Sequence, residues 1–281
     1  MGKVKRKLRE LGLKHLKIGH GGTLDPLASG ILPLAIGEAT KTISYVLTGD
    51  KAYDFTVRWG IATTTDDAEG EAVDTSDVRP REAQIRASLP AFIGTILQTP
   101  PVYSALKVDG ARAYDLARAG ETVELASREV QIRELELTDL PDADHASFTV
   151  ACGKGTYIRS LGRDLARKLG TCGHLSELIR IQAGPFGMHQ AISLETVAEI
   201  RDIEALQTVL LPLTTVLDDI PALAVTASEA GKIRFGQSLL NISARAYADG
   251  DVILATEGGQ PVALMTKHGD MALKPLRVFN L

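Results

Sequence analysis

The chain has 281 residues, of which 44% are hydrophobic and 23% are charged, an ordinary composition for a folded globular protein. Its length suits one large domain with one small domain. No apolar run reaches the roughly 18 to 20 residues of a membrane-spanning helix, and no signal-peptide core follows the basic N-terminus. The two cysteines, Cys152 and Cys172, are too few for a disulfide scaffold and form no Cys-x-x-Cys motif. These features predict a cytoplasmic protein without membrane attachment or a metal-ligand cluster.

Positive charge is concentrated in two segments, although the net charge of the chain is -4. Residues 1–20 carry a net charge of +6, and residues 153–180 carry +4. Acidic residues gather instead in 60–82 and 195–229. Local positive potential attracts polyanions, so the two basic segments suit contact with a phosphate backbone. Two solvated helix faces would carry the same charges and are the plainer alternative.

Apolar periodicity predicts the elements of the chain in order. Those of the first half are a helix within 3–17 that ends near Gly12, a structured loop at 19–38, a helix at 38–47, a strand at 53–59 and a helix opened by Pro80. Those of the second half are a strand at 102–108, a helix at 111–118, strands at 130–137 and 148–151, a helix from Ile158 to Gly170, and short strands at 252–256, 261–266 and 273–278. Strands and helices alternate without a regular βαβ rhythm, which predicts an α+β fold.

A stretch rich in Gly and Pro has the composition of a ligand site. Residues 20–30 read HGGTLDPLASG, in which Gly21 and Gly22 let the backbone come close to a ligand. Pro26 holds Asp25 in an extended conformation. A carboxylate on such a loop, beside His20 and basic residues, can act as an acid, a base or a nucleophile. A turn in which Asp25 only accepts backbone hydrogen bonds explains the same spacing.

A second candidate lies at residues 153–159, which read GKGTYIR. The stretch is not a phosphate-binding loop, because Phe148 stands where the first Gly is needed and Gly155 where Ser or Thr is needed. It predicts a tight turn that opens a helix, with Tyr157 and Arg159 near the helix start. The arginine could pair with a buried carboxylate. The alternative is a surface arginine on an amphipathic helix.

Residues 20–41, HGGTLDPLASGILPLAIGEATK, resemble the catalytic motif of the TruB family of tRNA pseudouridine synthases. Three further segments match the family in the same order: KAY at 51–53 with the strand that follows, SALK at 104–107, and GKGTYIR at 153–159. The resemblance is dense over residues 1–182 and loose beyond them. Four ordered motifs make a chance match very improbable.

The resemblance implies isomerisation of the T-loop uridine at position 55 of tRNA to pseudouridine. No electrons are gained or lost in that reaction, so it implies no cofactor. By position, Asp25 matches the family's essential aspartate, which attacks the base or the sugar or supports a glycal route. Tyr53 matches the residue that stacks on the flipped uracil, and Arg159 the partner that keeps Asp25 charged. The other matches are Tyr157 and Leu178 as pocket walls and His20 as the side chain that fills the space of extruded bases.

The family also implies a partner and a domain plan. The partner is the T stem-loop of tRNA, and the resemblance implies neither a membrane nor an obligate protein partner. We expect a catalytic domain with a central mixed sheet over 1–182, a connecting region over 183–225 and a small β-rich module over 226–281. In the family the last region often carries a PUA or PUA-like RNA-binding barrel. A small cap that stabilises the catalytic domain is the alternative.

The family pattern departs from this sequence at the N-terminus. Family members normally begin with a strand and a Lys-Pro-x-Gly motif, whereas Met1 here falls inside the expected first helix. A start upstream and a true truncation both explain this, and loss of the strand would expose a sheet edge. The alternative function is therefore a catalytically silent tRNA-binding or tRNA-folding protein. Less favoured alternatives are an RNA-guided relative that works with ribonucleoprotein partners and a hydrolase with an aspartate nucleophile.

Overall fold

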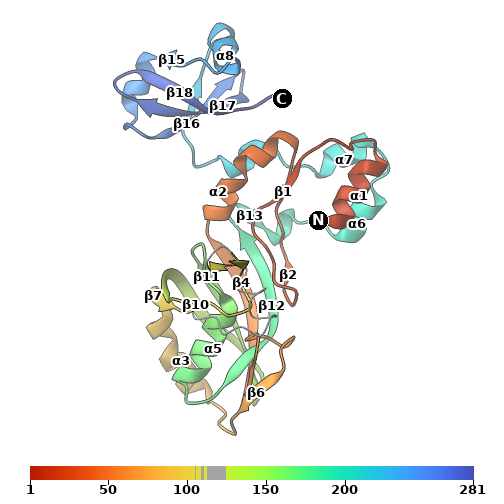
Figure 1. Ribbon diagram of the computed structural model, residues 1–281, viewed down its shortest axis with the longest axis vertical. Helices are drawn as coiled ribbons and strands as arrows, with labels where there is room; N and C mark the ends of the chain where they lie inside the picture. Colours follow the sequence, from red (N-terminus) through yellow and green to blue (C-terminus); the bar gives the residue numbers. More distant parts are fainter. Residues whose placement is uncertain (105, 109–110, 113–124) are drawn as a thin grey trace. The chain divides into compact units, whose positions relative to one another are not determined.

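The computed structural model describes residues 1–281 except 105, 109–110 and 113–124 (Figure 1). The chain forms two compact units. The central-sheet unit consists of Gly22–Leu32 and Leu47–Ala191, and the terminal unit consists of Met1–Gly21, Pro33–Val46 and Ile192–Leu281. The expected domain borders after residues 182 and 225 stay predictions.

A seven-stranded sheet forms the middle of the central-sheet unit. Its strands are β2 (Ser29–Gly30), β4 (Lys51–Trp59), β7 (Gly94–Gln98), β10 (Arg128–Asp142), β11 (His145–Cys152), β12 (Gly173–Ala183) and β13 (Phe186–Gly187). The order is β13-β12-β4-β11-β10-β7 with antiparallel neighbours, and β2 lies parallel to β12. The predicted α+β class with a central mixed sheet is confirmed.

Strand β4 shows how the alternating pattern builds this sheet. Phe55, Val57 and Trp59 point into the core and are almost fully buried, while the residues between them are less buried. The ring of Phe55 stacks on Phe148 of β11 with centroids 5.2 Å apart, and Trp59 meets the same ring edge-on. Such aromatic pairs each add about 0.5–1.5 kcal/mol beyond the burial of their area.

Helix α5 (Ile158–Lys168) covers this sheet and contacts β12 and β4. Its predicted stripe is correct, since Ile158, Leu161 and Leu165 are buried and Gly170 follows the helix with a φ of +75°. A Cβ on Gly162 would lie 2.6 Å from Leu175 of β12. A larger residue at that position would therefore require the Leu175 side chain to move.

Strand β12 was not predicted, although it lies beside β4 in the middle of the sheet. Its pairing with β4 shifts register between Leu175 and Glu177 and again between Arg180 and Gln182. Each irregularity inserts an extra residue, so the side chains that face the core change parity along the strand. The period-two signal is thereby lost.

Of two predictions near residue 110, the strand at 102–108 is correct only at Lys107–Val108, and the helix at 111–118 is wrong where it is described. Residues 102–104 form bends instead of a strand, and only Lys107–Val108 of the expected strand pairs, as β8, with β9 (Ala111–Arg112). The expected helix at 111–118 thus begins in a strand, because these residues form cross-strand backbone hydrogen bonds. Its residues 113–118 lie outside the described part of the chain, as does Ala105.

The terminal unit contains a helical cluster around the N-terminus. Helix α1 (Gly2–Glu10) ends before Gly12, as predicted, and packs with α6 (Leu194–Glu199) and α7 (Ile203–Val209). Leu8 of α1 is buried against Leu206 in this cluster. Strands β1 (Ile18–His20) and β3 (Leu34–Ile36) then form a two-stranded ladder within the predicted loop.

A second part of the terminal unit is a five-stranded sheet in the order β14-β16-β17-β18-β15. Its strands are β14 (Ala222–Ala224), β15 (Leu239–Leu240), β16 (Val252–Glu257), β17 (Gln260–His268) and β18 (Ala272–Val278). The three predicted C-terminal strands are correct, but helix α8 (Ala227–Arg234), which packs on this sheet, was missed. Likeness of this module to a PUA barrel stays a prediction. Within the described part of the chain, no helix is both long and apolar enough to cross a membrane.

Candidate active site

The loop that carries Asp25 runs from Gly22 to the strand β2. The carbonyl oxygen of Asp25 accepts a hydrogen bond from the Ala28 N–H at 2.9 Å, which closes a turn with Pro26 at its second position. At the end of the loop Gly30 has a φ of +91°, and a Cβ there would lie 2.3 Å from the carbonyl oxygen of Arg180. Glycine at position 30 therefore lets the loop lie directly on β12.

Arg180 of β12 holds this loop by hydrogen bonds and is buried, with 2% of the residue exposed. Its Nε donates to the carbonyl oxygen of Ile31 at 2.8 Å, and its two terminal nitrogens donate to Thr23 and Gly22 at 3.3 and 3.2 Å. One guanidinium thus satisfies carbonyls at both ends of the loop. Arg180 lies in the basic segment 153–180, for which contact with a phosphate backbone is predicted. That interpretation is wrong for this residue, because its donors are buried and used within the protein.

The structure brings Asp25 and Arg159 together. Nε of Arg159, in the first turn of α5, lies 2.8 Å from Oδ2 of Asp25. The Asp25 side chain is 33% exposed, whereas only 5% of Arg159 is exposed. The remaining guanidinium nitrogens donate to the carbonyl oxygens of Thr65 and Tyr103, both at 3.0 Å. Arg159 is therefore no surface residue of an amphipathic helix, and it holds Asp25 by one carboxylate oxygen from a fixed position.

A second carboxylate, that of Asp67, also pairs with Arg159 and was not predicted from the sequence. Its Oδ2 lies 3.4 Å from Nη1 of Arg159, and the residue is 2% exposed. Its Oδ1 accepts hydrogen bonds from the Glu69 N–H at 3.1 Å and from the Thr65 hydroxyl. This buried charge is compensated, so Arg159 carries two carboxylates of which Asp25 alone is substantially exposed.

The neighbouring Asp66, in the loop at 63–67, has an unusual backbone conformation. Its φ is +60°, a conformation that a residue other than glycine rarely adopts. Its carboxylate pairs with Arg163 at 2.8 Å, and burial raises its pKa although the Arg163 charge opposes the rise. The loop is thus tied to α5 at two successive turns. The sequence TTTDD at 63–67 reads only as an acidic turn, which is why neither aspartate was singled out.

Tyr53 lies on β4 between Val150 of β11 and Arg180 of β12. Its partly buried side chain packs on the core together with Leu27 of the Asp25 loop. Burial raises the pKa of Tyr53 above its ordinary value of 10.0, the Arg180 charge opposes the rise, and the Asp25 charge adds to it. The phenol is therefore protonated at neutral pH.

The other two predicted walls also belong to the central-sheet unit. Leu178 of β12 is buried in the main core cluster. Tyr157 is half-buried at the start of α5, where the Gln98 side chain bonds its backbone N–H at 2.8 Å and its carbonyl oxygen at 3.1 Å. The Arg128 guanidinium lies 5.0 Å from the centre of its ring. Cation–π contact of this kind orients the ring.

His20, the sixth predicted site residue, is part of the terminal unit. It ends β1, pairs with Leu34 of β3 and is exposed. The structure therefore groups Asp25, Tyr53, Tyr157, Arg159 and Leu178 in one compact unit, and His20 in the other. No cluster of three or more His, Cys, Asp or Glu that could hold a metal occurs among the described residues.

Comparison with models of known families shows to which family the chain belongs. The model of the N-terminal domain of TruB family pseudouridylate synthases matches residues 6–158. The chain belongs to the TruB family. The model of the C-terminal domain of tRNA pseudouridylate synthase B matches residues 159–218, which continue the first match without a gap.

Curated relatives of this TruB family chain share about half of its residues. A protein named tRNA pseudouridine synthase B from Caulobacter vibrioides is 49% identical over 94% of this chain and 87% of its own length. A protein of the same name from Zymomonas mobilis is 49% identical over 99% of this chain and 89% of its own length. The similarity thus extends through both units.

Solved structures share the fold at lower sequence identity. A chain of a Cbf5-Nop10-Gar1 complex is 24% identical with a TM-score of 0.71, covering 99% of this chain and 80% of its own. A chain from an H/ACA RNP bound to a substrate RNA is 22% identical, also with a TM-score of 0.71, covering 98% and 79%. These likenesses support the fold of the TruB family chain.

Proposed function

We propose that this chain is a tRNA pseudouridine synthase that isomerises the uridine at position 55, in the T loop, with Asp25 as its catalytic carboxylate. Membership of the TruB family and the relatives named tRNA pseudouridine synthase B, at 49% identity over nearly the whole chain, support the activity. The observation that carries the role of Asp25 is its ion pair with the buried Arg159 at 2.8 Å. A partly exposed carboxylate that a buried arginine holds in place can meet a substrate.

The reaction breaks the bond between C1′ of the ribose and N1 of uracil and forms a bond between C1′ and C5. The proton of C5 leaves and N1 gains one, so atoms and electrons balance without a co-reactant. Asp25 is the group that engages the sugar or the base while the base is detached. Attack on the base, attack on C1′ and proton abstraction in a glycal route all need the same charged carboxylate beside the nucleoside.

The target uridine has to leave its loop before Asp25 can reach it. Unstacking a base costs a few kcal/mol, and contact with an aromatic ring recovers about 1–3 kcal/mol per base. Tyr53 supplies such a ring, with a phenol that is protonated at neutral pH because burial raises its pKa. Tyr157 and Leu178 serve as further walls, and His20 occupies the space that extruded bases leave.

Arg159 and Arg180 act as positioning residues in this proposal. Arg159 is held by carbonyls of Thr65 and Tyr103 as well as by Asp67, so it presents a preformed charge to Asp25. Arg180 fixes the loop on which Asp25 is mounted. Such preorganisation stabilises charge during the reaction without a reorganisation cost.

The alternatives are less well supported. A silent tRNA-binding protein would need no carboxylate held in this way, and the relatives share the enzyme's name along almost the whole chain. The solved chains from ribonucleoprotein complexes are 22–24% identical, well below the 49% of the tRNA pseudouridine synthases. We therefore propose activity on tRNA without an obligate protein partner. Such a substrate implies reaction in the cytoplasm.

The test is to map pseudouridine after incubating the chain with unmodified tRNA transcript, using chemical labelling and reverse transcription. We expect modification of the T-loop uridine alone, with a transcript lacking that uridine as the control. Modification at other positions would reject the proposed substrate. Absence of pseudouridine with tRNA binding retained would favour the silent binding protein.

A further inference from the structure

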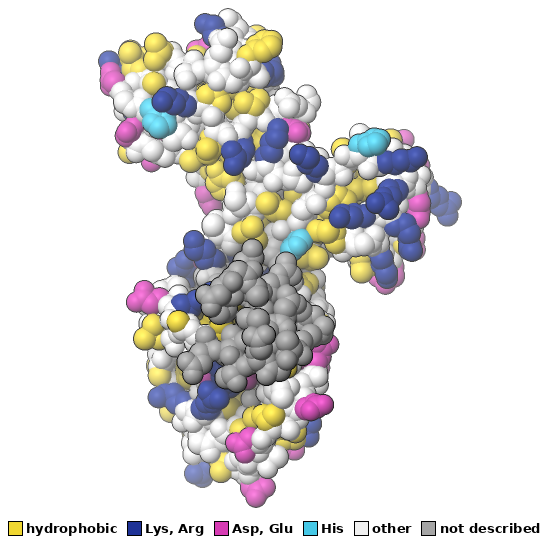
Figure 2. Space-filling view, in the orientation of Figure 1, with side chains coloured by type: hydrophobic (Ala, Val, Ile, Leu, Met, Phe, Trp, Pro, Cys, Tyr) yellow, Lys and Arg dark blue, Asp and Glu magenta, His cyan; other side chains and the backbone are white. Residues whose placement is uncertain are grey.

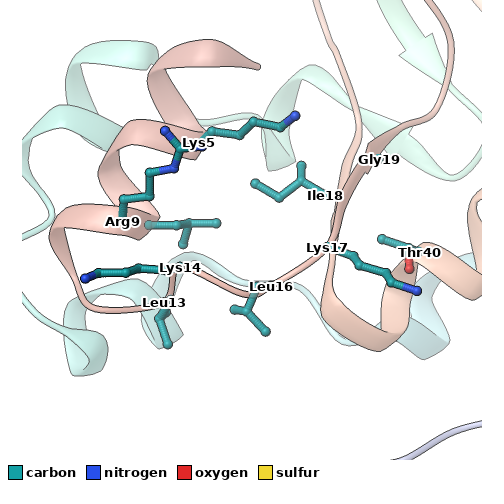
Figure 3. A pocket seen from close by; sticks show the side chains of 10 residues that line it. Lys5, Arg9, Leu13, Lys14, Leu16, Lys17, Ile18, Gly19 and Thr40 are labelled. Carbon is teal, nitrogen blue, oxygen red and sulfur yellow. The ribbon is translucent and has the colours of Figure 1, made fainter.

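A pocket in the terminal unit takes no part in the proposed chemistry. A cavity of about 440 Å³ opens between α1, the linker that follows it and β1 (Figure 3). Lys5 and Arg9 from α1 and Lys14 and Lys17 from the linker line it, and none of its ten lining residues is acidic. The pocket is therefore strongly electropositive.

These four cations are available for a ligand. In the described part of the chain, no ion pair joins any of them to a carboxylate, and all four are exposed. Neighbouring Arg6 and Lys7 do not line the pocket, and both pair with Glu10 at 3.7 and 3.1 Å. The helix thus has an internally compensated face and a face whose charges have no carboxylate partner. Figure 2 shows Lys and Arg side chains gathered over this region.

The floor of the pocket is apolar. Leu8, Leu13, Leu16 and Ile18 contribute to it, and Leu16 is 42% exposed although it is a large hydrophobic residue. Cations around an apolar floor match a nucleotide unit, whose phosphate needs the cations while its ribose or base covers the hydrocarbon. An acidic peptide would satisfy the cations and leave the floor exposed. The volume also lies in the usual range of ligand sites, about 300–1,000 Å³.

We propose that this pocket binds a phosphodiester unit of the substrate RNA, as an anchoring site built from different residues from those around Asp25. The inference rests on the proposed function in one respect, namely that the RNA is tRNA. Contacts of this kind release counterions from the RNA and so make binding dependent on salt. They fix the RNA without reading its sequence.

The first experiment compares two double variants of the full chain. Lys5→Gln with Arg9→Gln removes one Lys and one Arg from the pocket, and Lys3→Gln with Arg6→Gln removes the same charges from α1 outside it. Dissociation constants for unmodified tRNA transcript are measured between about 0.05 and 0.3 M salt. We expect the pocket variant to bind about tenfold more weakly, with a salt slope lower by about one per lost contact. Equal losses in both variants, or an unchanged pocket variant, would overturn the proposal.

Phosphate-ethylation interference then tests the contact itself. In the unaltered chain, ethylation of the phosphate bound in the pocket should block binding, and this interference should vanish in the pocket variant but persist in the Lys3→Gln, Arg6→Gln control. Lys14→Gln with Lys17→Gln, on the linker, should remove the same interference without altering the helix. An interference pattern that is identical in all proteins would contradict the site and leave an acidic protein as the occupant to test.

The two proposals fail in different ways. Interference that depends on the pocket, together with no pseudouridine in any protein, would reject the proposed reaction and retain the phosphate site. Pseudouridine formed with the same tRNA requirement in both double variants would reject the phosphate site and retain the reaction. If both proposals are correct, the pocket variant needs more tRNA than the control to reach half of its maximal rate.

Discussion

Two clusters of charge in this chain are built in opposite ways. Around Asp25, every charged group has a partner, and Arg159, Asp67 and Arg180 are all at most 5% exposed. Around the α1 pocket, four cations are exposed, and none of them forms an ion pair with a carboxylate in the described part of the chain. Buried pairs lock a geometry, because moving one member leaves the other uncompensated. Exposed cations that form no ion pair within the protein can instead interact favourably with an anionic ligand. The first arrangement suits chemistry on one base, and the second suits attraction of a polyanion.

Removal of Arg159 should disturb the buried charge cluster more than any other single substitution. Arg159→Ala leaves the buried Asp67 carboxylate without its charge partner, so the free energy of unfolding should fall by about 3–5 kcal/mol. The Asp25 carboxylate also loses its anchor, and turnover should fall at least about 100-fold. Denaturant unfolding and single-turnover rates of pseudouridine formation measure the two losses.

Arg163→Ala is the matched control, since it lies one turn further along α5 and pairs with Asp66. It should destabilise the protein less, because Asp66 is more exposed than Asp67, and leave more of the turnover than Arg159→Ala. Equal effects of both substitutions on turnover would show that the Arg159 pair is only structural.

Gly30→Ala tests whether the Asp25 loop has to lie on β12. The new methyl group would meet the Arg180 carbonyl oxygen, and φ is +91°, so we expect a loss of at least about 3 kcal/mol in the free energy of unfolding. Gly155→Ala, with a φ of +81° and open space, should lose about 1–2 kcal/mol from conformation alone. Similar losses in thermal unfolding would mean that the close approach of the loop is unimportant.

Tyr53→Ala tests the stacking surface. Removing the ring should weaken capture of the flipped base by about 1–3 kcal/mol and also slow turnover, which steady-state kinetics on tRNA transcript would show as changes in both KM and kcat. Tyr53→Phe retains the ring and separates stacking from the phenol. A Tyr53→Ala protein with unaltered kinetics would remove Tyr53 from the site.

The titration of Tyr53 should also differ, by a smaller amount, from that of an exposed tyrosine. Burial raises its pKa above 10.0, so the folded state holds this proton more tightly than the unfolded state does. The associated stabilisation is present below about pH 10 and is lost as pH rises through the native pKa. An ultraviolet difference titration of wild type against Tyr53→Phe should show ionisation above pH 10. Ionisation below that value would contradict the burial of the phenol.

Much of the fold could be predicted because its elements keep one period throughout. Strand β4 alternates cleanly at Phe55, Val57 and Trp59, and α5 keeps a helical stripe up to Gly170. Strand β12 could not be predicted, because two register shifts move its core-facing side chains from one parity to the other. Helix α8 has little contrast between its faces and lies among short β-like runs, so local pattern did not reveal it.

The sequence predicted the site residues that stand in a recognisable motif. It did not predict those whose role depends on contacts with residues far away in the chain. Asp25 and Arg159 stand in stretches that match the family, whereas Asp67 and Arg180 gain their roles from partners that are distant in sequence. The number of charges in 153–180 predicted contact with a phosphate backbone. Arg159 and Arg180 do not fit that prediction, because both are buried and their donors form hydrogen bonds within the protein. The position of a charge in the sequence does not show whether the side chain is buried and bonded within the protein or exposed and able to bind RNA.

The catalytic role of Asp25 is tested by Asp25→Asn, which keeps the shape of the side chain and removes its charge. We expect loss of pseudouridine formation in single-turnover experiments, while the dissociation constant for tRNA stays within about tenfold, since the substitution removes chemistry and little contact area. Comparable losses of turnover and binding would show that Asp25 holds its loop together. Turnover close to that of wild type would contradict its catalytic role outright.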